Sequence, residues 1–278
     1  MPNDLNDSND SNDSNDLNDS NDLNDPNDSN DLNNPIDEQH SHYYVHTLME
    51  PTVIFEDNHL LVLNKPAGWL VQADRTGDLT LTDWGKTYLK EKYAKPGAVY
   101  LHPAHRIDRP VSGAVLFGRT DKALSRLTTL FKEKKIEKTY LALTINAPVS
   151  NAGELRHYLS KDEKRNTVEV FSKPRGDAKE SITRYETLEK VGNLFLLKVE
   201  PITGRPHQIR AQLAAIGCPI LGDLKYGAPY ALSDASIGLH CRSMKLVHPV
   251  RLEALKVEAE FPEKEWWAQA RFRMSNVQ

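Results

Sequence analysis

Hydrophobic positions are distributed unevenly along the 278 residues, and the change marks a boundary near residue 50. Residues 3–32 repeat Asn-Asp followed by Ser, Leu or Pro, and they contain almost nothing that a core could bury. Such a segment cannot offset the entropy that it would lose on ordering. We therefore predict a disordered acidic tail over residues 1–38, a linker over residues 39–50 and one folded domain over residues 51–275.

Within the folded part, short apolar runs at residues 53–55 and 60–63 flank four polar residues, a pattern that predicts two strands joined by a turn. Lys65-Pro66-Ala67-Gly68 then predicts a loop. Thr120 or Asp121 can cap a helix that ends in a lysine-rich turn. The apolar residues of this helix share one face: Ala123, Leu124, Leu127, Leu130 and Phe131.

Further strands are predicted at residues 139–145, and at residues 182–188 and 194–199 on either side of a Gly-Asn turn. Residues 255–261 alternate between apolar and polar, as a half-buried strand does. Strands and helices mix without a regular βαβ alternation. This order favours an α+β fold with a largely antiparallel sheet.

Charge is as uneven as hydrophobicity. The formal net charge is -4, but residues 1–38 hold twelve Asp or Glu and no Lys or Arg. Subtracting these twelve from the 39 acidic residues leaves 27 against 35 basic ones, a balance of about +8 for residues 39–278. That balance permits a phosphate-rich partner. For the tail itself we favour slippage at a repetitive coding sequence over competition with RNA or weak cation binding.

Candidate metal and disulfide chemistry is sparse. Cys218 and Cys241 are the only cysteines, and neither lies in a metal-ligand spacing. His40, His42 and His46 cluster in the linker, where an exposed segment is a better interpretation than a metal site. The chain has no apolar run of membrane-spanning length and no secretory signal pattern, so we expect a soluble, cytoplasmic protein.

The densest polar stretch is residues 105–113, His-Arg-Ile-Asp-Arg-Pro-Val-Ser-Gly. Asp108 lies between Arg106 and Arg109, and opposite charge favours its ionised form. An ionised carboxylate beside arginines suits a nucleophile for an RNA substrate, because arginines engage phosphate. Taken alone, an ordinary surface loop of ion pairs explains the stretch better.

A second cluster, residues 203–210, reads Thr-Gly-Arg-Pro-His-Gln-Ile-Arg and opens a predicted helix. A Gly-Arg turn at a helix N-terminus suits an anion, because free backbone N–H groups and the helix dipole both favour negative charge. A capped helix start with solvated basic residues is the alternative, and it would be preferred for an isolated occurrence.

Together, the two clusters resemble the signature of the RluA branch of the pseudouridine synthases, from about Val53 to about Phe261. The resemblance includes Lys65-Pro66-Ala67-Gly68 and three later motifs, at residues 137–142, 222–227 and 239–249. Two positions depart from the common form, since Ile107 stands where Leu is usual and Val111 where Thr is usual. The resemblance implies the synthase catalytic fold, an α+β domain with a mixed, largely antiparallel sheet, flanking helices and a central active-site cleft.

The resemblance also implies an isomerase that cleaves uracil from C1′ of a uridine in RNA and rejoins it through C5. Asp108 would be the catalytic carboxylate, by covalent attack or as a base in an elimination, and both routes stay open. Tyr140 would stack on the extruded uracil and assist loss of the C5 proton, whereas a core tyrosine is the alternative. Arg210 would pair with Asp108 and keep it charged.

RNA contacts are expected from residues near these three. Arg106 is the candidate for insertion into the base stack, because a guanidinium can lie against bases. The other expected RNA-binding residues are Lys65, Arg109, Arg205 and His207. No cofactor or metal is expected.

The expected partner is a structured RNA, with a ribosomal RNA stem-loop ahead of a transfer RNA, and the expected state is a monomer without membrane contact. The alternative from another class is a catalytically inactive RNA-binding or RNA-chaperone protein on the same scaffold, which would be free to lose Asp108. A phosphate-handling enzyme ranks last, because the chain lacks a P-loop.

Overall fold

The computed structural model describes residues 49–74 and 76–275. All of them belong to one compact unit. The predicted tail, the predicted linker up to residue 48 and the histidine cluster lie outside the described residues.

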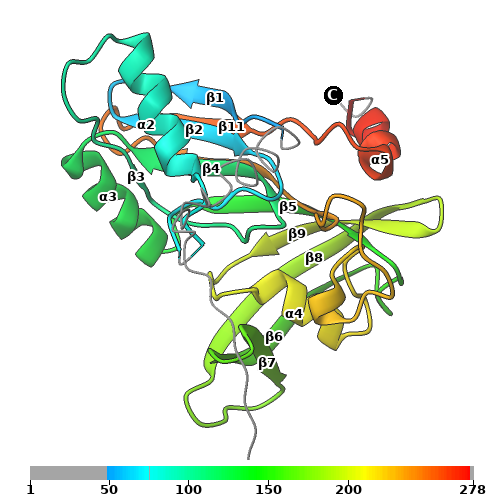
Figure 1. The fold of residues 1–278 in the computed structure, drawn as a ribbon. Coiled ribbons are helices and arrows are strands. Elements are labelled where there is room, and N and C mark those ends of the chain that lie inside the picture. Colours follow the sequence, from blue (N-terminus) through cyan, green and yellow to red (C-terminus); the bar gives the residue numbers. More distant parts are fainter. Residues whose placement is uncertain (1–48, 75, 276–278) are drawn as a thin grey trace, which may run out of the picture. The chain divides into compact units, whose positions relative to one another are not determined.

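One large sheet and a few helices make up the described part (Figure 1). The strands of the first half are β1 (Thr52–Glu56), β2 (Leu60–Lys65), β3 (His102–Pro103), β4 (Ser112–Gly118) and β5 (Glu137–Thr144). Those of the second half are β6 (Ala152–Asp162), β7 (Thr167–Phe171), β8 (Lys179–Val191), β9 (Leu194–Pro201), β10 (Leu239–Val247) and β11 (Ala254–Glu258). The helices are α2 (Leu81–Lys92), α3 (Asp121–Lys132), α4 (Gln208–Ala215), α5 (Glu265–Ser275) and the short 3-10 helix η1 (Leu224–Tyr226).

The 11-stranded sheet has the order β1-β2-β4-β10-β5-β9-β8-β6-β7, with β3 beside β4 and β11 beside β10. Among the named strands of the described part, only β4 and β10 pair in parallel. This arrangement confirms the predicted α+β fold with a mixed, largely antiparallel sheet. Strand β10, late in the sequence, lies between β4 and β5, two strands of the first half.

Close packing of β4 on β10 explains a glycine at the start of β4. Gly113 has φ +115°, and a Cβ there would lie 2.3 Å from the carbonyl oxygen of Cys241 in β10. Only glycine combines that backbone conformation with so close an approach. The loop that precedes β4 is therefore anchored directly against the centre of the sheet.

Most of the predicted elements are confirmed. β1 and β2 form the expected antiparallel hairpin, and the Thr120 hydroxyl caps α3 by accepting from Ala123 N at 3.2 Å. The strand predicted to reach Phe261 is too long, since β11 ends at Glu258 and the Phe261 ring stacks on His240 instead. Helices α2 and α5 were not predicted.

Apolar side chains from all parts of the sheet form the main core, against which α2 and α3 pack. Helix α2 buries Leu81 and Leu89, and Thr80 and Asp83 form a reciprocal capping box at its start. Helix α5 buries Trp267 in a second cluster with residues of β5, β8 and β9. No helix in the described ranges has the length and apolarity needed to cross a membrane.

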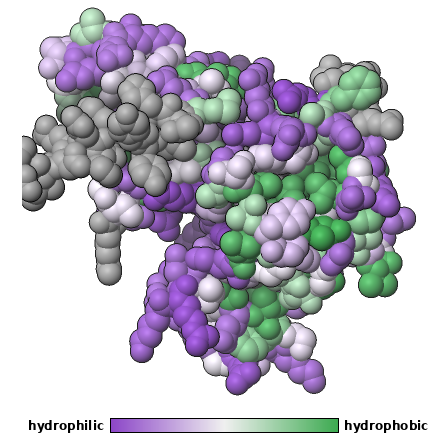
Figure 2. All heavy atoms as spheres, turned by 45° about the vertical axis from the view of Figure 1, so that its right-hand side comes forward, coloured by the Kyte–Doolittle hydropathy of each residue, from purple (hydrophilic) through white to green (hydrophobic). Residues whose placement is uncertain are grey.

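Figure 2 shows that hydrophobic residues gather in the middle of one face, whereas its lower end, where Figure 1 places β6 and β7, is mostly hydrophilic. Several large apolar side chains are exposed, among them Val149, Leu224, Tyr230 and Phe272. Exposed apolar atoms are common on folded proteins, so this face by itself indicates no ligand.

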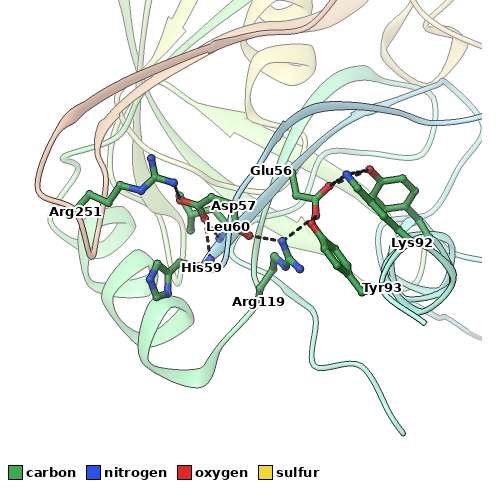
Figure 3. Close-up of polar contacts among 9 residues, drawn as sticks. Glu56, Asp57, His59, Leu60, Lys92, Tyr93, Arg119 and Arg251 are labelled. Carbon is green, nitrogen blue, oxygen red and sulfur yellow. Dashed lines mark hydrogen bonds and ion pairs between the residues drawn. The ribbon is translucent and has the colours of Figure 1, made fainter. Parts of the chain in front are cut away.

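The β1–β2 turn is tied to α2 and β4 by a buried carboxylate (Figure 3). Glu56 is at the end of β1 and accepts four hydrogen bonds, from Lys92 Nζ (2.7 Å), Tyr88 Oη (2.9 Å), Tyr93 Oη (2.6 Å) and Arg119 Nη1 (2.9 Å). Burial alone would raise the pKa of Glu56, but these hydrogen bonds and the charge of Lys92 lower it to about 2. The carboxylate is therefore fully ionised at neutral pH.

The neighbouring Asp57 ties the same turn to the segment after β10 (Figure 3). Its carboxylate accepts from the backbone N–H groups of His59 and Leu60 at 2.7 and 2.8 Å, and it forms an ion pair with Arg251. His248 Nε2 lies 3.0 Å from the same carboxylate. Strand β10 is thus fixed at its far end as well as at Gly113.

We predict that Gly113→Ala lowers the free energy of unfolding by about 3 kcal/mol or more, because the new Cβ would overlap the β10 backbone at a positive φ. Urea denaturation measures the change. The matched control is Gly192→Ala, also at positive φ but with nothing within 4 Å of the added Cβ, for which we expect a loss of about 1 kcal/mol. Equal losses in the two variants would contradict the close approach.

We predict that Glu56→Gln lowers the free energy of unfolding at neutral pH by about 1 to 3 kcal/mol. The folded-state pKa of about 2 lies below the ordinary 4.5, so this stabilisation is present above 4.5 and is lost as pH falls toward 2. The difference between wild type and variant in urea denaturation should therefore shrink from about pH 5 to about pH 2. Glu91→Gln, at an exposed position of α2, is the control without such a trend.

Candidate active site

The loop between β3 and β4, residues 104–111, places Asp108 at the centre of the sheet. Val111 N donates to Asp108 O at 3.0 Å and closes a tight turn, and Ala104 N donates to Leu116 O at 2.8 Å. The side chains of Ile107 and Val111 are buried in the main core. The two positions that depart from the common signature therefore anchor the loop, and Asp108 is left partly exposed.

Asp108 is held by a buried arginine from the second half of the chain. Arg210 Nη1 donates to Asp108 Oδ2 at 2.9 Å. The other edge of the same guanidinium is bound by Asp223, to which Nε donates at 2.7 Å and Nη2 at 2.8 Å. Such a bidentate pair fixes the plane of the guanidinium and so the direction in which Nη1 points.

The electrostatics of this trio follow from burial. The side chains of Arg210 and Asp223 are 6% and 1% exposed, whereas that of Asp108 is 27% exposed. Burial by itself would lower the pKa of Arg210, but hydrogen bonds and charge from Asp223 and Asp108 raise it above its ordinary value. Arg210 thus remains a cation, and Asp108 is the more exposed of its two carboxylate partners.

Tyr140 lies beside this trio, in β5 and directly opposite Cys241 of β10. Its side chain is buried, and burial, followed by contact with the Cys241 thiol and the charge of Asp108, raises the pKa of the phenol well above its usual range. Tyr140 is therefore a protonated phenol at rest. The structure brings together all three residues predicted to be catalytic.

Lys65 does not fit the RNA contact predicted for it. Its side chain is fully buried, and Nζ donates to three backbone carbonyl oxygens, those of Pro66 (3.0 Å), Trp69 (2.8 Å) and Arg109 (3.0 Å). Burial lowers the pKa of Lys65 to about 7, against the opposing effect of Asp108. The prediction that Lys65 contacts RNA is wrong. Its amine is buried and donates to a carbonyl oxygen of the Asp108 loop instead of facing a ligand.

Arg109 is only partly available. Its Nη1 forms an ion pair with Asp78 at 2.8 Å, and Nε donates to Gly68 O at 2.9 Å. Arg106 is exposed, and its guanidinium has no hydrogen bond or ion pair with any residue of the described part. Of the two arginines that flank Asp108, Arg106 is the one free to meet a ligand.

The second predicted cluster surrounds the start of α4. Arg205 is exposed, and its Nε donates weakly to Glu180 O at 3.3 Å. The Gln208 side-chain oxygen already accepts from Thr203 Oγ1 (2.7 Å) and Arg205 N (2.9 Å), so part of the predicted anion-binding turn is used internally. His207 precedes α4 with φ 50° and is half-buried.

Three further residues of the site were not assigned from the sequence. Asp223, Tyr226 and Cys241 all contact a predicted catalytic residue. The signal for Asp223 and Tyr226 was their place in the matched motif at residues 222–227, whereas nothing in the sequence singled out Cys241. Within the described ranges, no three His, Cys, Asp or Glu side chains group as a metal site would require.

Comparison with known proteins agrees with this geometry. A family model described as RNA pseudouridylate synthase matches residues 59–215. "Ribosomal large subunit pseudouridine synthase C" of Rickettsia conorii is 35% identical over 76% of this chain and 68% of its own length. The protein of the same name from Vibrio parahaemolyticus is 34% identical over 78% of this chain and 67% of its own length.

Solved structures resemble the fold as well. "Human RNA Pseudouridylate Synthase Domain Containing 4" superposes with a TM-score of 0.65 at 25% identity, over 84% of this chain and 95% of that chain. "Human RNA Pseudouridylate Synthase Domain Containing 1" gives 0.59 at 25% identity, over 77% of this chain and 84% of that chain. With the family model and the curated relatives in agreement, the chain belongs to the RNA pseudouridylate synthases and is an isomerase of uridine in RNA.

Proposed function

We propose that the protein isomerises a uridine of large-subunit ribosomal RNA to pseudouridine, with Asp108 as the catalytic carboxylate. The observation that carries the proposal is the placement of Asp108, the exposed end of a carboxylate–arginine–carboxylate trio beside Tyr140. The names of the Rickettsia and Vibrio relatives support ribosomal RNA as the substrate class. We accordingly assign the enzyme to the cytoplasm, where a ribosomal RNA substrate of this kind is found.

The reaction breaks the bond between N1 of uracil and C1′ and forms a bond between C5 and C1′. N1 gains a proton and C5 loses one, so substrate and product contain the same atoms. The Asp108 carboxylate serves either route to cleavage, as a nucleophile at C1′ or as a base that removes a ribose proton. Arg210 holds that carboxylate in place through the charge-assisted hydrogen bond at 2.9 Å.

Tyr140 suits two tasks at the freed base. Its aromatic ring offers a stacking surface for uracil, as flipped nucleotides require. Its hydroxyl, protonated at rest and close enough for Asp108 to raise its pKa, can accept the C5 proton while passing its own to the carboxylate. Both tasks need the ring and the hydroxyl to stay where β5 and β10 hold them.

Extruding the nucleotide from folded RNA costs a few kcal/mol, and the gap must be filled. Arg106 is exposed, has no partner in the described part and is two residues from Asp108, so we assign it to the base stack. Arg205 and His207, at the start of α4, are placed to meet the RNA backbone. Arg109 contributes mainly to the order of the site, through its ion pair with Asp78, and less to RNA binding.

We predict that Asp108→Asn lowers isomerisation at least about a thousandfold, because the amide can neither attack nor accept a proton. The substitution keeps the shape of the side chain, and Arg210 retains Asp223. Release of tritium from RNA made with 5-tritiated uridine measures the loss of the C5 proton. Asp177→Asn, at an exposed position where the carboxylate accepts from Ser160 Oγ and not from Arg210, should match wild type.

The same assay tests the RNA class. The wild-type enzyme is given two RNA preparations separately. One is large-subunit ribosomal RNA and the other is a mixture of transfer RNAs, and both are made by transcription and carry no modification. Release from the ribosomal RNA alone is the expected result, and pseudouridine mapping then locates each uridine that is modified. Release from transfer RNA alone would overturn the proposed substrate, and undiminished release by Asp108→Asn would overturn the proposed carboxylate.

We predict that Tyr140→Phe keeps RNA affinity within about threefold but lowers the isomerisation rate by about a hundredfold, because it keeps the stacking surface and removes the proton acceptor. Tyr140→Leu removes both the stacking surface and the proton acceptor, so it should lower the RNA affinity as well as the isomerisation rate. Filter binding gives the affinity, and single-turnover tritium release gives the rate. A Tyr140→Phe variant as fast as wild type would restrict Tyr140 to stacking.

A further inference from the structure

Tyr226 is a residue without an assigned role that touches several parts of the site. It ends η1, in the same turn of residues 222–227 that supplies Asp223. Its hydroxyl oxygen accepts from Val168 N of β7 at 2.9 Å and lies 2.8 Å from His207 Nδ1. One phenol therefore joins β7, η1 and the start of α4.

The Arg210 guanidinium lies over the ring of Tyr226. Its central carbon is 5.1 Å from the centroid of this ring, a distance at which a cation is attracted to an aromatic face. Asp223 and Asp108 bind the edges of the same guanidinium. With the ring contact added to these hydrogen bonds, Arg210 has little freedom to turn away from Asp108.

The hydroxyl of Tyr226 also bears on the tautomer of His207. Burial raises the pKa of Tyr226 to about 12, so the hydroxyl keeps its proton at neutral pH. Its oxygen accepts from Val168 N, an arrangement that favours donation of its proton to His207 Nδ1. Burial lowers the pKa of His207 and so favours the neutral imidazole, whose own proton such a donation places on Nε2. That nitrogen has no hydrogen-bond partner in the described part.

Tyr226 further connects the site to the β6–β7 hairpin. Leu159, Val168 and Ala211 form a small apolar cluster between this hairpin and α4, and Tyr226 packs against it. Next to Tyr226, Lys225 Nζ donates to Asn166 O in the hairpin turn at 3.0 Å. A change in the position of the hairpin would therefore move the groups that hold Arg210.

We propose that Tyr226 is a positioning residue of the isomerase, whose ring holds Arg210 toward Asp108 and whose hydroxyl orients His207 with an Nε2–H donor. The proposal rests on the proposed function, since it concerns how that site is kept in order. Tyr226 itself does not meet the reacting atoms. Its effect reaches them through Arg210 and His207.

The test compares Tyr226→Phe, which removes only the hydroxyl, with Tyr226→Leu, which also removes the aromatic face. Tyr230→Phe is the matched control, because Tyr230 follows in the same segment and is 53% exposed. At saturating RNA we expect the single-turnover rate to fall about fivefold in Tyr226→Phe and about thirtyfold or more in Tyr226→Leu, with the control unchanged. RNA affinity should stay within about twofold in Tyr226→Phe, a split between rate and binding that loss of folded protein would not produce.

A second readout does not depend on activity. In protein with nitrogen-15 histidine, the His207 signals, identified by their absence in His207→Gln, should show an unprotonated Nδ1 and a protonated Nε2. Tyr226→Phe should turn this state into a mixture of tautomers, whereas Tyr230→Phe should not. Melting temperatures of all variants show whether the fold is kept.

The outcomes separate the two proposals. Unchanged rates and unchanged His207 signals in Tyr226→Phe, with an active wild type, would overturn the role of Tyr226 and leave the proposed function standing. A wild type that releases no tritium from any RNA would overturn the proposed function, while the His207 signals would still decide whether Tyr226 orients that side chain. If RNA affinity and single-turnover rate fell equally in Tyr226→Phe, that result would also contradict a positioning role for Tyr226.

Discussion

A single buried guanidinium organises the site. Arg210 is almost inaccessible to water, and an unpaired charge at such a position would be strongly destabilising. Asp223 binds it with two hydrogen bonds and Asp108 with one, while the Tyr226 ring lies against it. Because the fold must satisfy this cation, it must also bring Asp108 to one place. The contact that stabilises the buried cation is therefore also the contact that positions the proposed catalytic carboxylate.

The sheet supplies the rest of the geometry. Gly113 allows β10 to approach β4, and β10 then places Cys241 opposite Tyr140. Lys65 joins the Asp108 loop to the segment after β2, because its amine donates to Arg109 O in the loop and to the carbonyl oxygens of Pro66 and Trp69. Each of these contacts fixes backbone, so the reactive side chains extend from rigid strands and a short anchored loop. Enzymes gain from such rigidity, because a small misplacement of a reacting group is costly in rate.

Local features of the fold were predictable from the sequence, and long-range ones were not. Spacing of apolar residues and a capping threonine identified α3, and two short apolar runs identified the β1–β2 hairpin. The parallel pairing of β4 with β10 joins residues more than a hundred positions apart, and no local pattern encodes it. Likewise, a motif can identify Lys65 as important without showing that its amine is buried. The pairing of Asp108 with Arg210 was expected only through the family resemblance, whereas Asp223, their third partner, became apparent only in three dimensions.

The position of β10 also has a consequence for synthesis on the ribosome. Chains emerge from the N-terminus, and domains with distant pairings fold late and slowly. The strands up to β9 are complete by Pro201, yet Arg210, Asp223 and the central strand at Leu239–Val247 follow them. A nascent chain of this enzyme therefore carries Asp108 for much of its translation without the partners that make it reactive. If ribosomal RNA is the substrate, the growing enzyme is surrounded by that RNA while it is still inert, and activity begins only when the last part of the sheet is inserted.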